Sequence, residues 1–453
     1  MEHIFPKQIQ RHYEKLIQNG YEAFFVGGST RDILLKREVK DYDIATNATP
    51  TQILELFPDG FYDNTYGTVG VPFEEGEKKY IAEITTYRSE GIYQDHRHPK
   101  DVTWGTSINQ DLKRRDFTVN AIAAKLENGK LQLTDPFNGQ KDIEHKIIRA
   151  VGVPLERFEE DALRLIRGIR LATQLGFEIE EKTLSAITHH APLLASIAQE
   201  RIKEELQKIL ESEHAYDGIM LLKNTNLLEV ILPELLLGVN VSQVRPGRHH
   251  TTDVFTHNML SLKFCPSNNW LVKFAALIHD IGKPKVASVD QEGFIIFHNH
   301  EIVGAKMAEH IAERLRFSNK EKDKVVSLVR WHMFSLEEHS TDAAIRRFIR
   351  RVGVEYIQDI LDLRIADRLG SGSKEDSWRF SKFRARIEEQ LQPAPFSLTD
   401  LAINGNDLMK ELSLSPSKQI GILLAKLFNE VDEDLSKNTK EYLLKRAKEL
   451  NAA

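Results

Sequence analysis

The chain has 453 residues, of which 41% are hydrophobic and 28% are charged, and its formal net charge is −6. No apolar run reaches the roughly 20 residues of a membrane helix. The single cysteine, Cys265, excludes a disulfide framework and a cysteine-based metal knuckle. The first residues mix charged with apolar side chains, unlike the core of a signal peptide. We expect a cytoplasmic globular protein of several domains that binds no membrane and holds its metals on His, Asp and Glu.

Short β-rich runs alternate with turns between residues 22 and 150, which predicts an α+β domain. A helix is expected over 49–57, capped by Thr49 or Thr51. A hairpin is expected over 121–135, because Asn128-Gly129 suits a tight two-residue turn. The other expected strands cover 22–28, 41–46, 68–73 and 79–88.

Strand signals almost vanish after about residue 155, and apolar residues then recur at helical spacings of three and four. Breaks that contain Gly and Pro, near residues 240 and 393, divide this helical region. We therefore expect four domains, which cover residues 1–150, 151–240, 241–392 and 393–453.

Three arginine clusters are candidate contacts for a nucleic acid in this mildly acidic chain. The cluster over 346–351 is more typical of a solvated helix face. The clusters are Arg114 and Arg115; Arg164, Arg167 and Arg170; and Arg346, Arg347, Arg350 and Arg351.

Two aspartates, Asp41 and Asp43, lie two residues apart in an expected strand, so their carboxylates project to one face. Such close like charges are costly without a cation, and Mg²⁺ prefers carboxylate and phosphate oxygens. The pair alone could be a chance occurrence. However, the preceding Gly27-Gly28 lets backbone amides approach a phosphate, and the expected helix that follows favours anions at its start. Glu83, in a later strand, either adds a third carboxylate or faces outward.

The stretch EDALR places Asp161 and Arg164 three residues apart, on one face of an expected helix. A surface ion pair is the usual meaning of this spacing. Cytosine and adenine both present an amine donor beside a ring-nitrogen acceptor, whereas uracil and guanine present the reverse order. A carboxylate beside a guanidinium therefore complements C or A and leaves buried groups unpaired against U or G.

An expected buried helix, LVKFAALIHDIGKP, ends in His279-Asp280. Such a pair alone is usually a hydrogen-bonded pair in a core. Ligands of this kind drawn from several helices, without cysteine, suit a metal that activates water. The expected ligands are His257, His279, Asp280 and Asp367, with His300 and His332 as secondary candidates.

Five ordered motifs in the first 210 residues resemble class II tRNA nucleotidyltransferases, which comprise CCA-adding enzymes and bacterial poly(A) polymerases. The motifs are GGSTRDILLKREVKDYDIAT, RRDFTVNAIA, DPFNGQKDI, EEDALRLIRGIRLATQLGF and ERIKEELQKIL. The resemblance implies a polymerase-β-like nucleotidyltransferase head, with a mixed sheet and helices, followed by an all-helical neck. Residues 245–370 resemble an HD phosphohydrolase domain, and the tail after 393 resembles the helices that grip the tRNA elbow.

The resemblance implies template-independent addition of CCA to the 3′ end of tRNA from CTP and ATP, with two Mg²⁺ ions on Asp41 and Asp43. Glu83 joins them as a catalytic candidate. Asp161 and Arg164 would select the base with support from Glu160, while Arg115 would contact the triphosphate and Asp116 the ribose. The full nucleotide-binding set is Gly27, Gly28, Arg31, Asp32, Arg114, Arg115, Asp116, Asn120, Glu160, Asp161, Arg164, Arg167 and Arg170.

Several alternatives remain open at this point. Residues 87–104 are similar to the flexible loop that full CCA-adding members need for the terminal A, which argues against a CC-only enzyme. An A-only adding enzyme shares the same motifs and is the nearest rival, ahead of a poly(A) polymerase and of an HD-type nucleotide hydrolase. The HD centre would hold a divalent transition metal and trim damaged 3′ ends, or would keep the fold without turnover.

Overall fold

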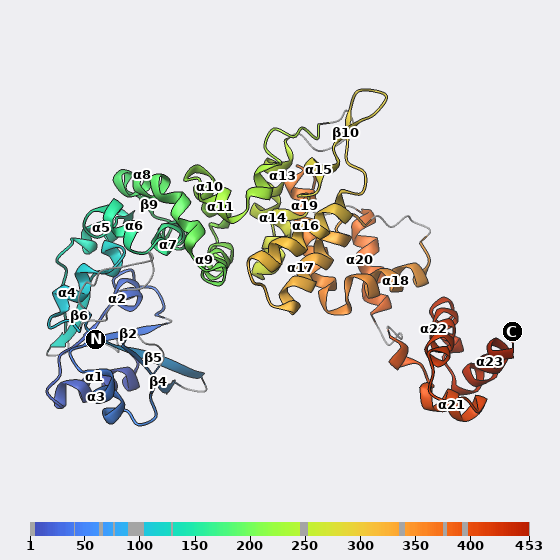
Figure 1. The fold of residues 1–453 in the computed structure, drawn as a ribbon, viewed down its shortest axis with the longest axis horizontal. Coiled ribbons are helices and arrows are strands. Elements are labelled where there is room, and N and C mark those ends of the chain that lie inside the picture. Colours follow the sequence, from blue (N-terminus) through green and yellow to red (C-terminus); the bar gives the residue numbers. More distant parts are fainter. Residues whose placement is uncertain are drawn as a thin grey trace. The chain divides into compact units, whose positions relative to one another are not determined.

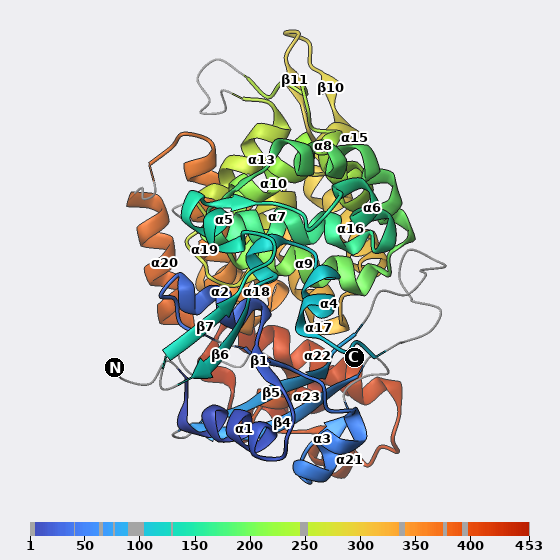
Figure 2. The ribbon, with the colours of Figure 1, turned by 90° about the vertical axis from the view of Figure 1, so that its left-hand side faces the viewer.

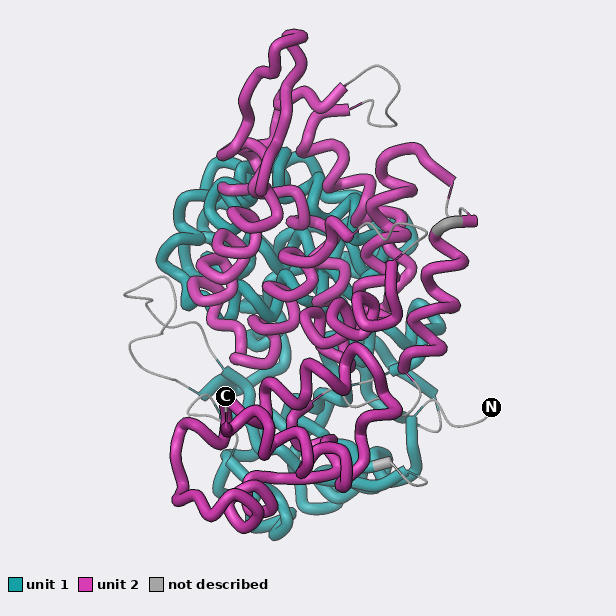
Figure 3. Tube along the Cα trace, turned by 90° about the vertical axis from the view of Figure 1, so that its right-hand side faces the viewer, with its two compact units in different colours: residues 1–233 teal, residues 234–453 magenta. Residues whose placement is uncertain are grey.

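The computed structural model describes residues 5–39, 41–62, 67–75, 78–88, 104–127, 130–244, 252–334, 340–374, 378–391 and 397–452. The chain divides into two compact units, residues 1–233 and 234–453 (Figure 3). Among the helices that the structure describes, none has the length and apolar character needed to cross a membrane.

A seven-stranded mixed sheet forms the centre of the first part of unit 1, in the order β3-β4-β5-β2-β1-β6-β7. β2 and β5 run parallel, and the other neighbouring strands pair antiparallel. The strands are β1 (Ala23–Phe25), β2 (Tyr42–Thr46), β3 (Phe61–Tyr62), β4 (Thr68–Glu75), β5 (Lys78–Thr86), β6 (Ala123–Glu127) and β7 (Lys130–Thr134). The strands and the hairpin expected here are confirmed, while the expected turn at 128–129 lies outside the described residues.

The two faces of this sheet carry different side chains because neighbouring residues of a strand point to opposite sides. Tyr42 and Ile44 of β2 are buried in a core beneath α1 (Lys7–Gln18) and α3 (Pro50–Leu56) (Figure 1). Helix α3 has Thr49 as its N-cap, within a capping box, as one of the two expected alternatives had it. Asp43, which lies between them, points to the opposite face, and Asp41 directly precedes β2.

Helices make up the remainder of unit 1, and two of them carry the EDALR motif. Helix α6 (Pro154–Glu160) ends just before the motif's aspartate, and α7 (Leu163–Leu175) begins two residues later. Helix α7 packs against α9 (Gln199–Glu211) and α10 (Ala215–Asn224). The other helices here are α2 (Gly27–Leu34), α4 (Ile108–Lys113), α5 (Gly139–His145), α8 (Glu181–His190) and α11 (Leu227–Ile231).

Unit 2 consists mainly of helices around two separate apolar cores. The first core lies within α14 (Trp270–Ile278), α17 (Asn319–Trp331), α18 (Asp342–Val352), α19 (Ile357–Gly370) and α20 (Trp378–Gln390), with α13 (Val254–Lys263) packed on α14 and α19. A short hairpin, β10 (Ser288–Val289) and β11 (Ile295–Ile296), precedes α16 (His300–Arg314) (Figure 2). The second core joins α21 (Gly405–Leu412), α22 (Lys418–Glu433) and α23 (Lys440–Ala452).

Candidate nucleotide and metal sites

A carboxylate cluster lies on the sheet where β2 and β5 run side by side. Asp43 and Glu83 are register partners of the parallel pair, and Asp41 directly precedes β2 with an exposed side chain. Burial, followed by the charge of Glu83, raises the pKa of Asp43 to about 7, while Arg115 acts in the opposite direction. A cluster of oxygen ligands that repel one another suits a hard divalent cation, which would relieve the repulsion.

Gly27 lies against this cluster and is the first residue of α2, so the helix includes both glycines instead of following them. Its φ of +67° is in the left-handed region, and a Cβ there would lie 2.8 Å from Asp43 Oδ2 and 3.1 Å from Arg115 Nη1. Glycine is therefore needed both for backbone conformation and for space. Four residues later, Arg31 donates to Asn120 Oδ1 at 2.8 Å, which joins two of the expected nucleotide-binding residues.

Asp111 is a buried acid that contacts two of the expected site residues and that the motifs did not single out. It is 1% exposed, and its two carboxylate oxygens accept from Arg114 Nη2 at 2.8 Å and from Arg115 Nη2 at 2.9 Å. Burial opposes the charged form, but Arg115 and Arg114 lower the pKa of Asp111 to about 2. An acid on α4, three and four residues before two arginines that follow the helix, was the available signal, because this spacing lets one carboxylate orient both guanidiniums.

Asp116 and two arginines of α7 form the next layer of the pocket. Arg167 Nη2 lies 2.8 Å from Asp116 Oδ2, and the Phe117 amide donates to Asp116 Oδ1. Burial opposes ionisation of Asp116, yet Arg167 and Arg164 lower its pKa. Arg170 Nε lies 2.8 Å from Glu205 Oε2 on α9. Both arginines thus have counter-ions within the protein.

Asp161 and Arg164 are not on one helix face, so that expectation is wrong. Asp161 follows the last residue of α6 with an extended backbone (φ −144°, ψ 104°), and Arg164 lies in α7. Arg164 Nη1 instead donates to Glu160 Oε2 at 2.5 Å. Asp161 Oδ1 accepts from the Leu163 amide at 3.0 Å, as caps of short turns do. The two side chains therefore do not form the surface ion pair that their spacing suggested.

The loop expected over 87–104 lies mostly outside the described residues, which resume at Trp104. Its described ends pair with each other through an isolated bridge between Arg88 and Trp104. The expected role of this loop in adding the terminal A stays a prediction.

Four of the expected metal ligands of unit 2, all histidines, converge on the carboxylate of a fifth, Asp280, which is buried. Its Oδ2 lies 3.3 Å from His257 Nε2 and 3.4 Å from His279 Nε2. Its Oδ1 lies 3.2 Å from His300 Nε2 and 3.5 Å from His332 Nε2. Each pair of histidines makes with Asp280 a trio that could hold a metal ion. The two secondary candidates are therefore as close to the centre as the primary ones.

Asp367 adds a fourth group beside the first trio, with its Oδ1 3.3 Å from His257 Nε2. Arg364 lies 2.8 Å from the other oxygen of Asp367. Burial opposes ionisation, but His257, His279 and Arg364 hold the pKa of Asp367 well below its usual range. The carboxylate is thus kept in the charged form that a metal ligand requires.

Three of the histidines are held in the form that metals bind. The Nδ1 atoms of His279, His300 and His332 lie 2.7–2.9 Å from backbone carbonyls. A carbonyl can only accept, so each Nδ1 carries the hydrogen and each Nε2 presents its lone pair inward. His257 Nε2 lies 3.1 Å from His279 Nε2. Burial opposes the charged form of His257, but its hydrogen bonds to Asp280 and Asp367 raise its pKa to about 9. The donor set fits a divalent metal that accepts nitrogen and oxygen ligands.

Lys283, which the sequence analysis did not single out, also lies in this centre. Its Nζ is 2.5 Å from Asp280 Oδ2 and donates to Gln243 Oε1 at 2.7 Å. Together with His279 it lowers the pKa of Asp280, against the opposing effect of burial. A buried ammonium beside a metal centre can bind a phosphate oxygen of a substrate.

The arginine cluster of α18 is neither a solvated face nor a bare nucleic-acid patch. Arg346 is 3% exposed, and its guanidinium donates to Gln390 Oε1 and to Asp432. Arg350 forms two bonds with Asp432, at 2.7 and 2.9 Å, and Arg347 pairs with Glu433 at 2.7 Å. These arginines bind the end of α22 to α18.

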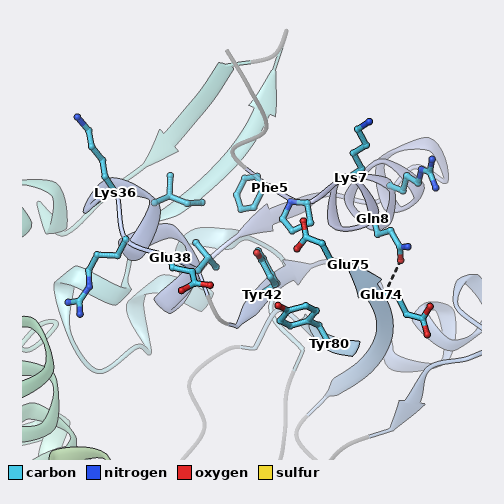
Figure 4. A pocket seen from close by; sticks show the side chains of 14 residues that line it. Phe5, Lys7, Gln8, Lys36, Glu38, Tyr42, Glu74, Glu75 and Tyr80 are labelled. Atoms are coloured by element: carbon cyan, nitrogen blue, oxygen red, sulfur yellow. Dashed lines mark hydrogen bonds between the residues drawn. The ribbon is translucent and has the colours of Figure 1, made fainter. Parts of the chain in front are cut away.

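A cavity of about 900 Å³ lies beside the core face of β2. Figure 4 shows Tyr42, Tyr80 and Glu75 on its wall, with Lys7 and Lys36 at its sides. Its wall contains none of the expected site residues. The carboxylates of the opposite face, and not this cavity, therefore mark the candidate active site.

Three family models match the chain. The model described as "Poly A polymerase head domain" matches residues 23–149, "Probable RNA and SrmB- binding site of polymerase A" matches 176–237, and "HD domain" matches 257–371. The first model covers the carboxylate cluster, the second covers α8 to α11, and the third covers the histidine centre, while α6 and α7 lie outside all three.

Two curated relatives are similar over most of their length. The CCA-adding enzyme of Anoxybacillus flavithermus is 34% identical over 400 residues, which are 87% of this chain and 85% of the relative. That of Lactococcus lactis subsp. cremoris is 32% identical over 98% of this chain and 96% of the relative.

The solved structure of the Bacillus stearothermophilus CCA-adding enzyme in complex with CTP has a TM-score of 0.68 to this chain at 27% identity. The match covers 100% of this chain and 98% of that one. The expected fold class, a mixed-sheet head followed by helical domains that include an HD body, is confirmed.

Proposed function

Because the chain belongs to the family of CCA-adding enzymes, we propose that unit 1 adds C, C and A to the 3′ end of tRNA from CTP and ATP. The observation that carries this proposal is the pairing of Asp43 with Glu83 across β2 and β5, beside the Gly27 turn. Carboxylates on one face next to a glycine turn provide both a cation site and room for a triphosphate.

The carboxylate cluster of Asp41, Asp43 and Glu83 would hold Mg²⁺, with Asp41 and Asp43 as the principal ligands. Mg²⁺ bound there would help the 3′-hydroxyl to ionise and would neutralise charge on the leaving pyrophosphate. The Arg114 and Arg115 guanidiniums, held by Asp111, are preorganised to bind the triphosphate oxygens. Arg31 and Asn120, already bonded to each other, would contribute to the same pocket with Asp32.

Asp161 and Arg164 would serve as the protein template, reached from two consecutive elements instead of one helix face. Asp161 is the weakly compensated carboxylate of the pocket, since its ion pair is with Arg201 at 3.6 Å. It retains acceptor capacity for an exocyclic amine. Arg164, directed by Glu160, would donate to the ring nitrogen of cytosine or adenine. Uracil and guanine would leave these groups unpaired.

The domain arrangement that we propose follows the same division of tasks. Residues 1–150 would carry the chemistry, 151–240 would select the base, 241–392 would form the HD body, and 393–453 would bind the tRNA elbow. The cytoplasm, where tRNA is processed, is the expected location.

The test offers tRNA transcripts that end before the CCA, after C and after CC, with CTP or ATP alone and with both. Full CCA addition predicts two added nucleotides with CTP alone on the first transcript and three with both nucleotides. The A-only alternative, which the relatives do not favour, predicts no extension of the first two transcripts by CTP. Asp41→Asn should abolish every extension, whereas an HD-type nucleotide hydrolase would keep its main activity.

A second function, metal-dependent phosphohydrolysis at the histidine centre, is favoured by one observation. Four imidazoles and two carboxylates meet there, with three Nε2 lone pairs fixed by backbone bonds. We propose that this centre binds divalent transition metals and hydrolyses phosphate esters at damaged or cyclised 3′ ends. Incubation of the protein with a 2′,3′-cyclic phosphate and Mn²⁺, Ni²⁺ or Co²⁺ tests this proposal. If the protein neither hydrolyses the ester nor binds these metals, the domain retains the HD fold without catalytic activity.

A further inference from the structure

The guanidinium of Arg157, on α6, lies beside the proposed template pair. The residue is 6% exposed. Its Nη1 donates to Glu160 Oε2 at 2.8 Å, and its Nε donates to the carbonyl of Val151 at 3.2 Å. A buried arginine with bonds on two sides is fixed in one rotamer, because the planar group cannot rotate without breaking both.

Arg157 also contacts Arg164 through its main chain. Arg164 Nη1 donates to the Arg157 carbonyl at 2.9 Å as well as to Glu160 Oε2 at 2.5 Å. The same carboxylate oxygen thus accepts from both guanidiniums. Arg157 thereby provides a carbonyl acceptor for Arg164 and holds the Glu160 carboxylate that provides the second one.

These bonds determine which edge of Arg164 remains for a nucleotide. Both Nη1 hydrogens are used, and Nη2 donates to the Arg114 carbonyl at 3.2 Å. Within the described part of the chain, Arg164 Nε has no hydrogen-bond partner, so Nε–H and the second Nη2–H remain on one edge of the planar group. The hydrogen bonds of Arg164 to Glu160, Arg157 and Arg114 therefore fix the orientation of this edge before a nucleotide binds.

Through Val151, Arg157 is also connected to Asp116, the residue proposed to contact the ribose. The Val151 amide donates to the carbonyl of Asp116 at 3.0 Å, and the Val151 carbonyl accepts from Arg157. Gly152, which follows with a φ of +74°, would place a Cβ 3.7 Å from Arg157 Nη2. Arg157 therefore links the segment after Asp116 to the base-selecting arginine.

We infer that Arg157 is a positioning residue for base selection, which fixes Glu160 and through it the donor edge of Arg164. This inference rests on the proposed CCA addition. It predicts that loss of the Arg157 side chain lets Arg164 turn its donors, so that uracil and guanine are rejected less well. Discrimination between CTP and UTP should fall about tenfold, as for one buried polar group that is no longer held in place.

The experiment measures kcat/KM for CTP, ATP, UTP and GTP on tRNA that lacks CCA, with the full chain. Arg157→Gln should lower the CTP/UTP ratio about tenfold, and Arg157→Lys, which keeps the charge but cannot hold Glu160 and Val151 together, should give an intermediate ratio. The double variant with Glu160→Gln should have the ratio of Glu160→Gln alone, because Arg157 acts through that carboxylate. Arg149→Gln, which loses ion pairs to Asp142 and Glu180, should keep the wild-type ratio.

An equal loss for all four nucleotides, or an unchanged ratio, would overturn the inference and leave Arg157 a structural residue. If Arg157→Gln does not fold, a wild-type ratio in Arg157→Lys has the same meaning. Wild-type protein that adds no nucleotide would instead refute the proposed function, so the two failures are distinguishable.

Discussion

Asp43 and Glu83 are direct register partners in the parallel pair of β2 and β5. Parallel partners point to the same face, so residues forty positions apart in the chain bring their carboxylates together on a rigid sheet. Asp41, just before β2, adds a third charge. The cost of this repulsion is the physical reason to expect a cation at this position.

The first prediction concerns Gly27. Gly27→Ala should lower the rate of CTP incorporation at least tenfold, because the new methyl group would lie 2.8 Å from Asp43 Oδ2 and would displace it. Gly20→Ala is the matched control, since Gly20 also has a positive φ, of +85°, but no atom within 4 Å of its Cβ position. Both variants should lose about 1–2 kcal/mol of stability from backbone strain. Equal activities in the two variants would contradict the role of Gly27.

The second prediction is a dependence of stability on pH through Asp111. Its pKa falls from 3.8 to about 2 on folding, so its ion pairs stabilise the folded state above about pH 4 and are lost as the pH falls towards 2. Asp111→Asn should therefore cost about 2 kcal/mol near neutral pH and progressively less below pH 4.

Denaturant unfolding of the full chain, followed across that pH range, measures the effect of Asp111→Asn. The exposed Asp217, which lies 3.7 Å from His214, provides the control, since Asp217→Asn should change stability by less than about 0.5 kcal/mol. A cost of Asp111→Asn that is the same at all pH values would show that the carboxylate charge does not matter.

The third prediction concerns how many metal ions the histidine centre holds. Because Asp280 offers one oxygen to each histidine pair, wild-type protein should bind about two Ni²⁺ ions in the presence of excess Mg²⁺, and His332→Ala about one. Asp280→Ala should lose most of both. His310→Ala, in an exposed position on α16, should bind as wild type does.

Elemental analysis after dialysis gives these metal stoichiometries directly and does not depend on enzyme activity. One ion in the wild type, or an unchanged number in His332→Ala, would contradict a centre bridged by Asp280.

Much of the carboxylate site of unit 1 could be predicted, because the positions of its residues follow from local sequence patterns. Alternation in a strand was enough to put Asp41 and Asp43 on one face and Tyr42 in the core. The cap at Thr49 and the strands of the sheet also follow from local sequence, whereas the expected glycine turn proved to be the first turn of α2. The parallel pairing of β2 with β5 depends on the order of the strands, so the sequence left open whether Glu83 joins the aspartates or faces outward.

The remaining features depend on contacts that sequence spacing does not encode. The break between α6 and α7 at Asp161 contains neither Gly nor Pro, so helical spacing continued through it. The arginines of α18 looked solvated because their buried counter-ion, Asp432, lies more than eighty residues further along the chain. The position of Asp280 between the two histidine pairs likewise depends on helix packing that the sequence alone does not give.

The most direct test of base selection by the protein is Asp161→Ala with each nucleotide offered singly to tRNA that lacks CCA. We predict that the preference for CTP over UTP, measured as the ratio of kcat/KM, falls by about 10- to 100-fold, because the acceptor for the exocyclic amine is lost. Binding of tRNA should remain within about twofold of wild type, because Asp161 is proposed to contact the incoming nucleotide and not the tRNA. A variant that keeps the wild-type CTP/UTP ratio would contradict the claim that this carboxylate reads the base.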